Sequence, residues 1–185
     1  MFNFSIVLIV LLVIILLIAA FIIGTYNSLV RLREMIANAR GQIAAQMESR
    51  WDAITNLIQA TKQYTDYEEK VFQEVTERRA SIGKNSSVEE LEKEETLYQR
   101  AVGQINAVAE NYPNLRAGEL YQNTMTSVNE WENKVRHSRM LYNDSVTKYN
   151  RQLKTFPTNL IAAPFGFMEE SYFENTETKA EMPQW

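Results

Sequence analysis

Cysteine is absent from the chain, and histidine occurs once, as His137. The lack of cysteine excludes disulfide bonds, thiolate metal ligands and a cysteine nucleophile. A di-metal carboxylate site in a helix bundle requires Glu-x-x-His motifs on two helices, and the residue three before His137 is Lys134. No hydrolase elbow, phosphate-binding loop or zinc-protease motif occurs. We therefore predict no catalytic residue, no cofactor and no metal site, and we expect His137 to lie on the surface.

Helix breakers are also scarce, with four prolines and six glycines, and no proline occurs before Pro113. This scarcity predicts an all-α protein. Positive charge is not in excess either, since the net charge is −4. From Pro157 onward five glutamates stand against one lysine, so that residues 1–156 are neutral. No basic face is indicated, and we expect no nucleic-acid partner.

One long apolar run is present, from Ile6 to Ile23. As a helix it would reach about 27 Å, close to the ~30 Å hydrocarbon thickness of a bilayer. A cleaved signal peptide would need preceding positive charge and a small-residue cleavage site, which are missing. A core helix of a soluble protein would need a large domain around it. We predict a transmembrane anchor over residues 1–24 that contacts lipid through residues 6–23.

Flanking charge predicts the orientation of this anchor. No lysine or arginine precedes the run, whereas Arg31, Arg33 and Arg40 follow it closely. The positive-inside rule then predicts that the N-terminus lies outside and that the rest of the chain lies on the cytoplasmic face of the membrane.

Beyond the anchor, apolar residues recur every three or four positions as a stripe in each of three long stretches. The first stripe includes Leu29, Ile36, Ile43, Met47 and Ile54, and the third includes Val128, Val135, Tyr142, Val146, Tyr149, Leu153 and Phe156. The stripes predict a helix from residue 26 to about 79, a second from about 88 to 112, and a third that begins near 115–117 and runs to about 156. We expect these helices to pack as an antiparallel bundle of three or four long helices with coiled-coil character. Ser81 to Gly83 should end the first helix, a capping box from Ser87 to Glu90 should begin the second, and Tyr112-Pro113 should end it. We expect the bundle over residues 25–157, with residues 158–185 forming a short helix or strap and an acidic tail.

Several stretches, in chain order, resemble proteins of the LemA family. They are residues 26–30 (YNSLV), 50–58 (RWDAITNLI), 110–117 (ENYPNLRA), 142–150 (YNDSVTKYN), 156–162 (FPTNLIA), 165–167 (FGF) and 172–174 (YFE). Thr55 departs from the family, which usually has proline there, so a kink should be absent or weaker. The resemblance implies a bacterial, single-span, helical-bundle protein of the inner (plasma) membrane, and a family without established enzymatic activity. A magnetosome membrane protein is a member, and roles in membrane organisation or envelope processes have been suggested.

Three local features have both a functional and a structural interpretation. The pairs Tyr142-Asn143 and Tyr149-Asn150, one heptad apart, could form a docking stripe or ligand groove, or a core edge with buried hydrogen bonds. Arg50, Asp52 and Asn56 could form a charged binding site, but a buried, paired arginine that pins the bundle is favoured. The acidic start of the second helix could be a partner patch, and a solvated face is favoured. That start consists of Glu89, Glu90, Glu92, Glu94 and Glu95.

The functional prediction is a non-enzymatic membrane scaffold or interaction protein that assembles with copies of itself. Small residues in the anchor, Ala19, Ala20 and Gly24, give scope for close contact between helices. The alternative is an accessory or regulatory subunit of a membrane enzyme or envelope-stress system, bound to an unidentified protein through the bundle surface. An enzyme is the weakest of the three interpretations.

Overall fold

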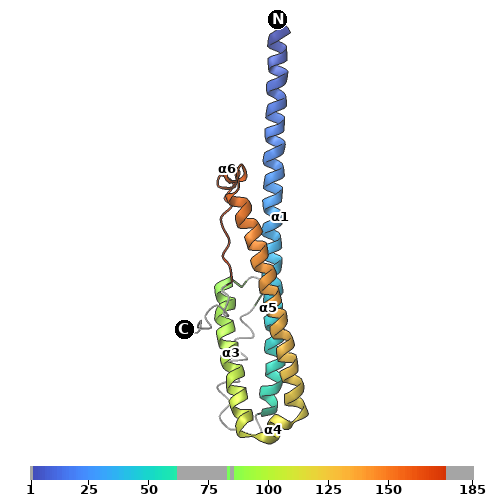
Figure 1. The fold of residues 1–185 in the computed structure, drawn as a ribbon, viewed down its shortest axis with the longest axis vertical. Helices are drawn as coiled ribbons and strands as arrows, with labels where there is room; N and C mark the ends of the chain where they lie inside the picture. The colour runs from blue at the N-terminus through green and yellow to red at the C-terminus, as the bar shows by residue number, and fades with distance from the viewer. Residues whose placement is uncertain (1, 62–82, 84–85, 174–185) are drawn as a thin grey trace, which may run out of the picture. The chain divides into compact units, whose positions relative to one another are not determined.

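The computed structural model describes residues 2–61, 83 and 86–173, and in these residues every regular element is a helix. The helices are α1 (Phe2–Thr61), α3 (Val88–Asn111), α4 (Pro113–Ala117), α5 (Glu119–Lys154) and α6 (Thr158–Ala162) (Figure 1). The prediction of an all-α protein with a long apolar helix at its N-terminus is confirmed. The helix count of the bundle remains a prediction.

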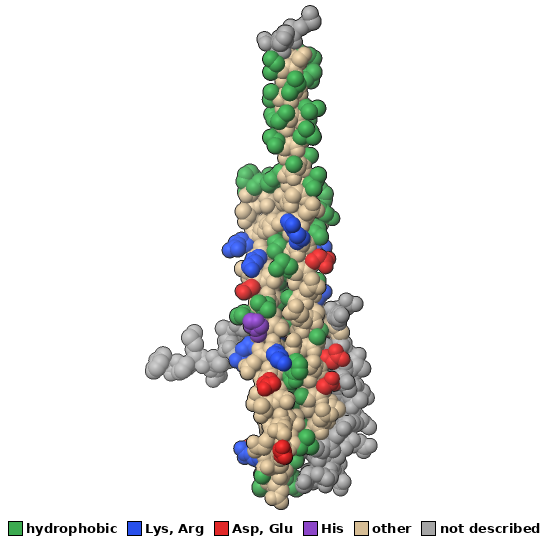
Figure 2. Space-filling view, turned by 90° about the vertical axis from the view of Figure 1, so that its right-hand side faces the viewer, with side chains coloured by type: hydrophobic (Ala, Val, Ile, Leu, Met, Phe, Trp, Pro, Cys, Tyr) green, Lys and Arg blue, Asp and Glu red, His purple; other side chains and the backbone are tan. Residues whose placement is uncertain are grey.

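Helix α1 runs from the apolar run into the polar part of the chain without a break, through Gly24 and through Thr55. Its first part is long and apolar enough to cross a membrane by length and composition. The side chains of residues 4–21 are exposed on every side of the helix (Figure 2). The predicted extension of this helix to residue 79, and its end near residues 81–83, fall largely on residues outside those described.

The local signals that begin and end α3 are confirmed. The Ser87 hydroxyl accepts a hydrogen bond from the Glu90 amide, and the Glu90 carboxylate accepts one from the Ser87 amide, which is the predicted capping box. The helix ends at Asn111, immediately before Tyr112-Pro113.

The third predicted helix is interrupted near its start, at Gly118. A single-turn helix, α4, ends at Ala117, and Gly118 adopts an extended conformation before α5 begins at Glu119. A Cβ atom at Gly118 would lie 3.1 Å from the Leu115 carbonyl oxygen, so the corner favours a residue without a side chain. The predicted third helix corresponds to α5, which begins at Glu119, after the break at Gly118 that was not predicted, and stops at Lys154, two residues before the predicted end.

By packing, the chain divides into two compact units, each described here by itself. We call Met1–Ala37 with Asp144–Ser171 the anchor unit, and Asn38–Asn143 with Tyr172–Trp185 the core unit. In the core unit, α1 and α3 run in the same direction and α5 runs antiparallel to both (Figure 1). These three helices share one apolar cluster, formed by Trp51, Ile54, Leu57, Tyr98, Ala101, Ile105 and Val128.

The predicted apolar stripes account for most of the buried residues. Leu29, Ile36, Ile43, Met47 and Ile54 of the α1 stripe are buried. The α5 stripe is likewise buried at Val128, Val135, Tyr142, Val146, Tyr149 and Leu153. Phe156 is the exception, because it follows the end of α5 and leaves the helical period. It is 74% exposed.

Candidate functional site

A buried arginine joins the three helices of the core unit. Arg50 of α1 is fully buried, and its Nη2 atom donates to Oε2 of Glu95 on α3 at 2.7 Å. Its Nη1 atom donates to Oε2 of Glu132 on α5, also at 2.7 Å. The Arg50 Cζ atom lies over the ring of Tyr98, 3.7 Å from its centroid. The interpretation of Arg50 as a buried, paired residue is confirmed, and one side chain ties α1 to both neighbours.

A second arginine reaches the same carboxylate. Arg139 of α5 donates from Nη2 to Oε2 of Glu95 at 2.8 Å, and the Gln99 amide donates to Oε1 at 2.9 Å. Burial alone would raise the pKa of Glu95, but the charges and hydrogen bonds of Arg50, together with the charge of Arg139, hold this pKa below its usual value. Two arginines thus face two glutamates, and the cluster is balanced in charge.

Aromatic packing encloses this charged cluster. The rings of Trp51 and Tyr98 meet edge to face with centroids 5.2 Å apart. Burial raises the pKa of Tyr98, with Arg50 opposing the rise, so this phenol stays neutral. Arg50 and Glu95 are shielded from solvent, whereas the side chain of Arg139 is 16% exposed and that of Glu132 is 30% exposed. A paired internal charge network of this kind favours one register of the three helices.

The predicted trio of Arg50, Asp52 and Asn56 is not brought together. Arg50 points into the core, whereas Asp52 and Asn56 line an open groove of about 430 Å³ between α1 and α5. The groove has a mostly polar lining, to which Ser49, Asn123, Thr124 and Ser127 also contribute. Trp131 completes one wall, and the ammonium group of Lys134 lies 3.8 Å from its ring centroid.

Both asparagines of the tyrosine–asparagine pairs bind the backbone of the C-terminal segment. In the core unit, the side-chain Nδ2 of Asn143 donates to the backbone carbonyl of Phe173 at 3.2 Å, and its Oδ1 accepts from the backbone amide of Phe173 at 2.9 Å. In the anchor unit, Asn150 makes the same pair of bonds with Glu170, at 2.9 and 3.0 Å. The structural interpretation of these pairs is favoured, since each carboxamide satisfies one extended residue of the tail.

The tyrosines of the two pairs are buried beside these contacts. Tyr142 meets Phe173 edge to face with ring centroids 5.0 Å apart. Burial raises the pKa of Tyr149, with Arg33 opposing the rise and Glu170 adding to it. Each pair therefore combines a buried tyrosine with what we call a backbone clamp, the two hydrogen bonds between the asparagine side chain and the backbone of one tail residue.

The acidic partners were missed by sequence reasoning. Glu94 and Glu95 belong to the stretch interpreted as a solvated face, yet both are 6% exposed. They follow Leu91 at the three- and four-residue spacing of the buried stripe, and a buried Arg50 requires a carboxylate partner. Those two signals together could have selected them. His137 is exposed as expected, and among the described residues no group of three or more acidic, histidine or cysteine side chains could hold a metal ion.

Comparisons with known proteins agree with the sequence resemblance. A sequence model described as LemA family matches residues 39–185. Magnetosome protein MamQ 2 of Paramagnetospirillum magneticum is 25% identical over 175 residues, covering 80% of this chain and 64% of the relative. Protein LemA of Metamycoplasma hominis is 25% identical over 160 residues, covering 84% of this chain and 71% of the relative. The chain thus spans just under two thirds of the length of the MamQ protein that it matches.

Proposed function

Since this chain belongs to the LemA family, we propose that it is a non-enzymatic, single-pass membrane protein whose helical part acts as a scaffold and assembles with further copies of itself. The observation that carries the proposal is the continuity of α1. One helix supplies the candidate membrane span and then buries Arg50 and Trp51 in the packed core. An anchor made this way is part of the domain that it holds, as a scaffold at a membrane requires.

The buried charges support binding rather than catalysis. Arg50 and Glu95 pair within the core, Arg139 reaches the same carboxylate, and none of the three lines the open groove. A catalytic group must reach a substrate, whereas a matched internal network keeps helices in register. The names of the relatives state no enzymatic activity either.

Self-assembly is supported by small residues on one face of the anchor. Ala20 and Gly24 are four residues apart, both are exposed on α1, and no atom lies within 4 Å of a Cβ built at Gly24. Such small-xxx-small spacing lets two spanning helices approach closely. For orientation, Arg31 and Arg33 immediately after the span favour a cytoplasmic helical domain.

The test is the mass of the complex in lipid nanodiscs, measured by mass photometry. Oligomers are expected for the natural chain, and Ala20→Ile with Gly24→Leu should shift them toward monomers. The matched control is Ile18→Phe, which adds volume about 200° around the helix from Ala20. Monomers alone for the natural chain would refute self-assembly. If Ile18→Phe reduced the oligomers as much as the double variant does, the face that carries Ala20 and Gly24 would not be the contact.

A second candidate function rests on the polar groove between α1 and α5. Its lining of hydroxyl, amide and carboxylate groups with one tryptophan suits a partner protein of a membrane enzyme or envelope-stress system. A photo-crosslinking amino acid at Asn56 would distinguish the two functions. A foreign protein crosslinked from Asn56, and not from the exposed Asn129, would favour the accessory role, and crosslinks to a second copy would favour the scaffold.

A further inference from the structure

An uncharged segment follows the last turn of α5, which we call the 156–168 loop. Between Lys154 and Glu169 the sequence holds no acidic, basic or histidine residue. Four apolar side chains of the loop remain exposed: Phe156 at 74%, Leu160 at 65%, Phe165 at 52% and Met168 at 79%. Apolar surface concentrated in this way on a short segment is a mark of an interaction site.

The opposite side of the loop is fixed firmly to the anchor unit. The Phe167 amide donates to the Ala162 carbonyl at 3.0 Å and the Gly166 amide to the Ala163 carbonyl at 3.1 Å. With Gly166 at φ +72°, these bonds form a Schellman motif that closes the turn after α6. Ala162 and Phe167 are buried by it. The loop is therefore held in shape by its inner side, and its exposed side chains are presented outward.

Tyr26 of α1 fixes the position of the loop along the anchor. Its ring centroid lies 5.5 Å from that of Phe165 and 5.5 Å from that of Phe167, both in edge-to-face geometry. Tyr26 comes three residues after Ile23, the last residue of the apolar run, which is a rise of about 4.5 Å. The headgroup layer on each side of the hydrocarbon core is roughly 5–7 Å thick. A ring at this depth, and any side chain touching it, lies at the membrane–water interface.

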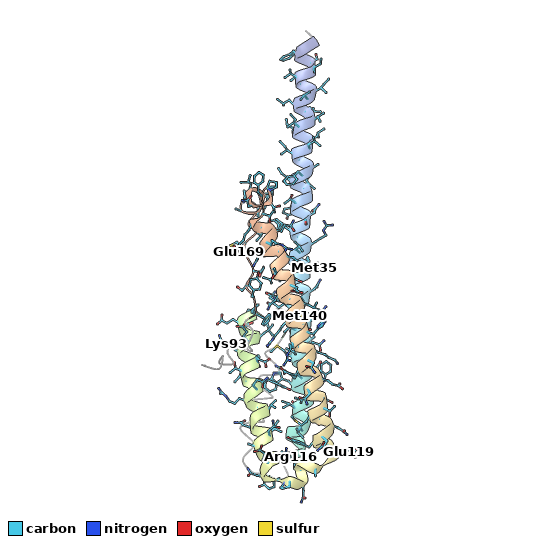
Figure 3. The ribbon with its side chains drawn as sticks, in the orientation of Figure 1. Met35, Lys93, Arg116, Glu119, Met140 and Glu169 are labelled. Atoms are coloured by element: carbon cyan, nitrogen blue, oxygen red, sulfur yellow. The ribbon has the colours of Figure 1, made fainter. Side chains whose placement is uncertain are left out.

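Charged groups of the same unit mark the edge of this apolar surface. The Lys154 ammonium binds the Glu169 carboxylate at 2.8 Å, and these two residues flank the loop. Glu169 is labelled in Figure 3. Earlier on α5, about two turns and one turn before its end, Lys148 and Arg151 line an open groove with Thr155. Exposed apolar atoms on the side of the anchor and exposed cations beyond them match the order of acyl chains and anionic headgroups. Figure 2 shows hydrophobic side chains next to the exposed apolar helix, followed by basic and acidic side chains.

We propose that the 156–168 loop is a second membrane contact, with Phe156, Leu160, Phe165 and Met168 inserted into the headgroup and upper acyl region of the leaflet that the anchor exits. The occupant of this surface is phospholipid, because the loop is continuous through Tyr26 with the lipid-contacting helix. The inference rests on the proposed membrane anchoring. It adds a fixed depth for the loop, and with it a restricted tilt of the anchor unit relative to the bilayer normal.

The absence of native cysteine makes a direct test straightforward. Single variants Leu160→Cys and Met168→Cys of the full chain are labelled with the fluorophore NBD and placed in vesicles of phosphatidylcholine and phosphatidylglycerol. Leu11→Cys serves as the reference inside the anchor, and Asp144→Cys as the exposed reference in the same unit. Far-UV circular dichroism confirms that each variant keeps its helices.

The expected result is a shift of NBD emission to shorter wavelength at 160 and 168, toward that of the Leu11 label. Both labels should be quenched by lipids carrying nitroxides near the headgroup, and not by aqueous iodide. Iodide quenching equal to that of the Asp144 label would overturn the proposal. Protection that disappears in nanodiscs holding one copy would also overturn it, since a second copy would then be the occupant. If the Leu11 label itself reported water, the anchoring would fail instead.

Discussion

The Arg50 Nη2 atom lies 2.7 Å from the Glu95 Oε2 atom, and both side chains are removed from solvent. The two residues are 45 positions apart in sequence, on α1 and α3. Arg139 reaches the same oxygen from α5. The Glu95 carboxylate thus pairs with an arginine from each of two other helices. Its removal would leave two guanidinium groups without their shared partner.

Glu95→Gln should therefore destabilise the protein strongly. Removing one member of a buried ion pair costs about 3–5 kcal/mol, because the remaining charge stays buried without compensation. Thermal unfolding in detergent, followed by far-UV circular dichroism, measures the loss. The control is Glu110→Gln on the exposed side of α3, which should change stability by less than about 0.5 kcal/mol. Equal effects of the two substitutions would contradict the role of the network.

The charge of the Glu95 carboxylate predicts that the stability of the folded protein depends on pH. The pKa of Glu95 lies below its usual value of 4.5 in the folded protein, because two arginines favour its charged form over the cost of burial. Its stabilisation is therefore complete above that usual value and is lost as the pH falls through the lower folded pKa. The difference in stability between the natural chain and Glu95→Gln should narrow on acidification. A constant difference from neutral pH to below pH 4 would contradict this.

How much of this site could be predicted depends on how far apart in the sequence the interacting residues lie. The capping box at Ser87 was predictable, because donor and acceptor lie within one turn of the same helix. The burial of Arg50 was predictable from its place beside a stripe. Sequence signals could have selected Glu94 and Glu95 as candidate partners, but not which glutamate pairs with Arg50, because the register of α1 against α3 is set by packing over the whole core. Phe156 was misplaced because periodicity does not show where a helix stops.

The backbone clamps predict local changes in amide exchange. Asn150→Ala removes both bonds to Glu170, so the Glu170 amide should exchange hydrogen faster, whereas the Phe173 amide should be unchanged. Asn143→Ala should give the reverse pattern. Leaving a buried backbone group unsatisfied costs about 1–3 kcal/mol, enough for a clear effect. Exchange mass spectrometry at peptide resolution measures both, with Asn129→Ala on the exposed side of α5 as the control. Faster exchange at both amides in every variant would indicate general loosening and contradict separate clamps.

Two glycine-to-alanine substitutions should change the stability of the protein in opposite directions. Gly166 has φ +72°, which an alanine adopts at a cost of about 1 kcal/mol, so Gly166→Ala should destabilise the turn that holds the 156–168 loop. Gly103 lies inside α3 with no atom within 4 Å of a built Cβ, so Gly103→Ala should stabilise the helix by up to about 1 kcal/mol. Thermal unfolding gives both signs, and amide exchange at Phe167 should rise in Gly166→Ala alone. A gain in stability from Gly166→Ala would show that the Schellman turn does not constrain the loop.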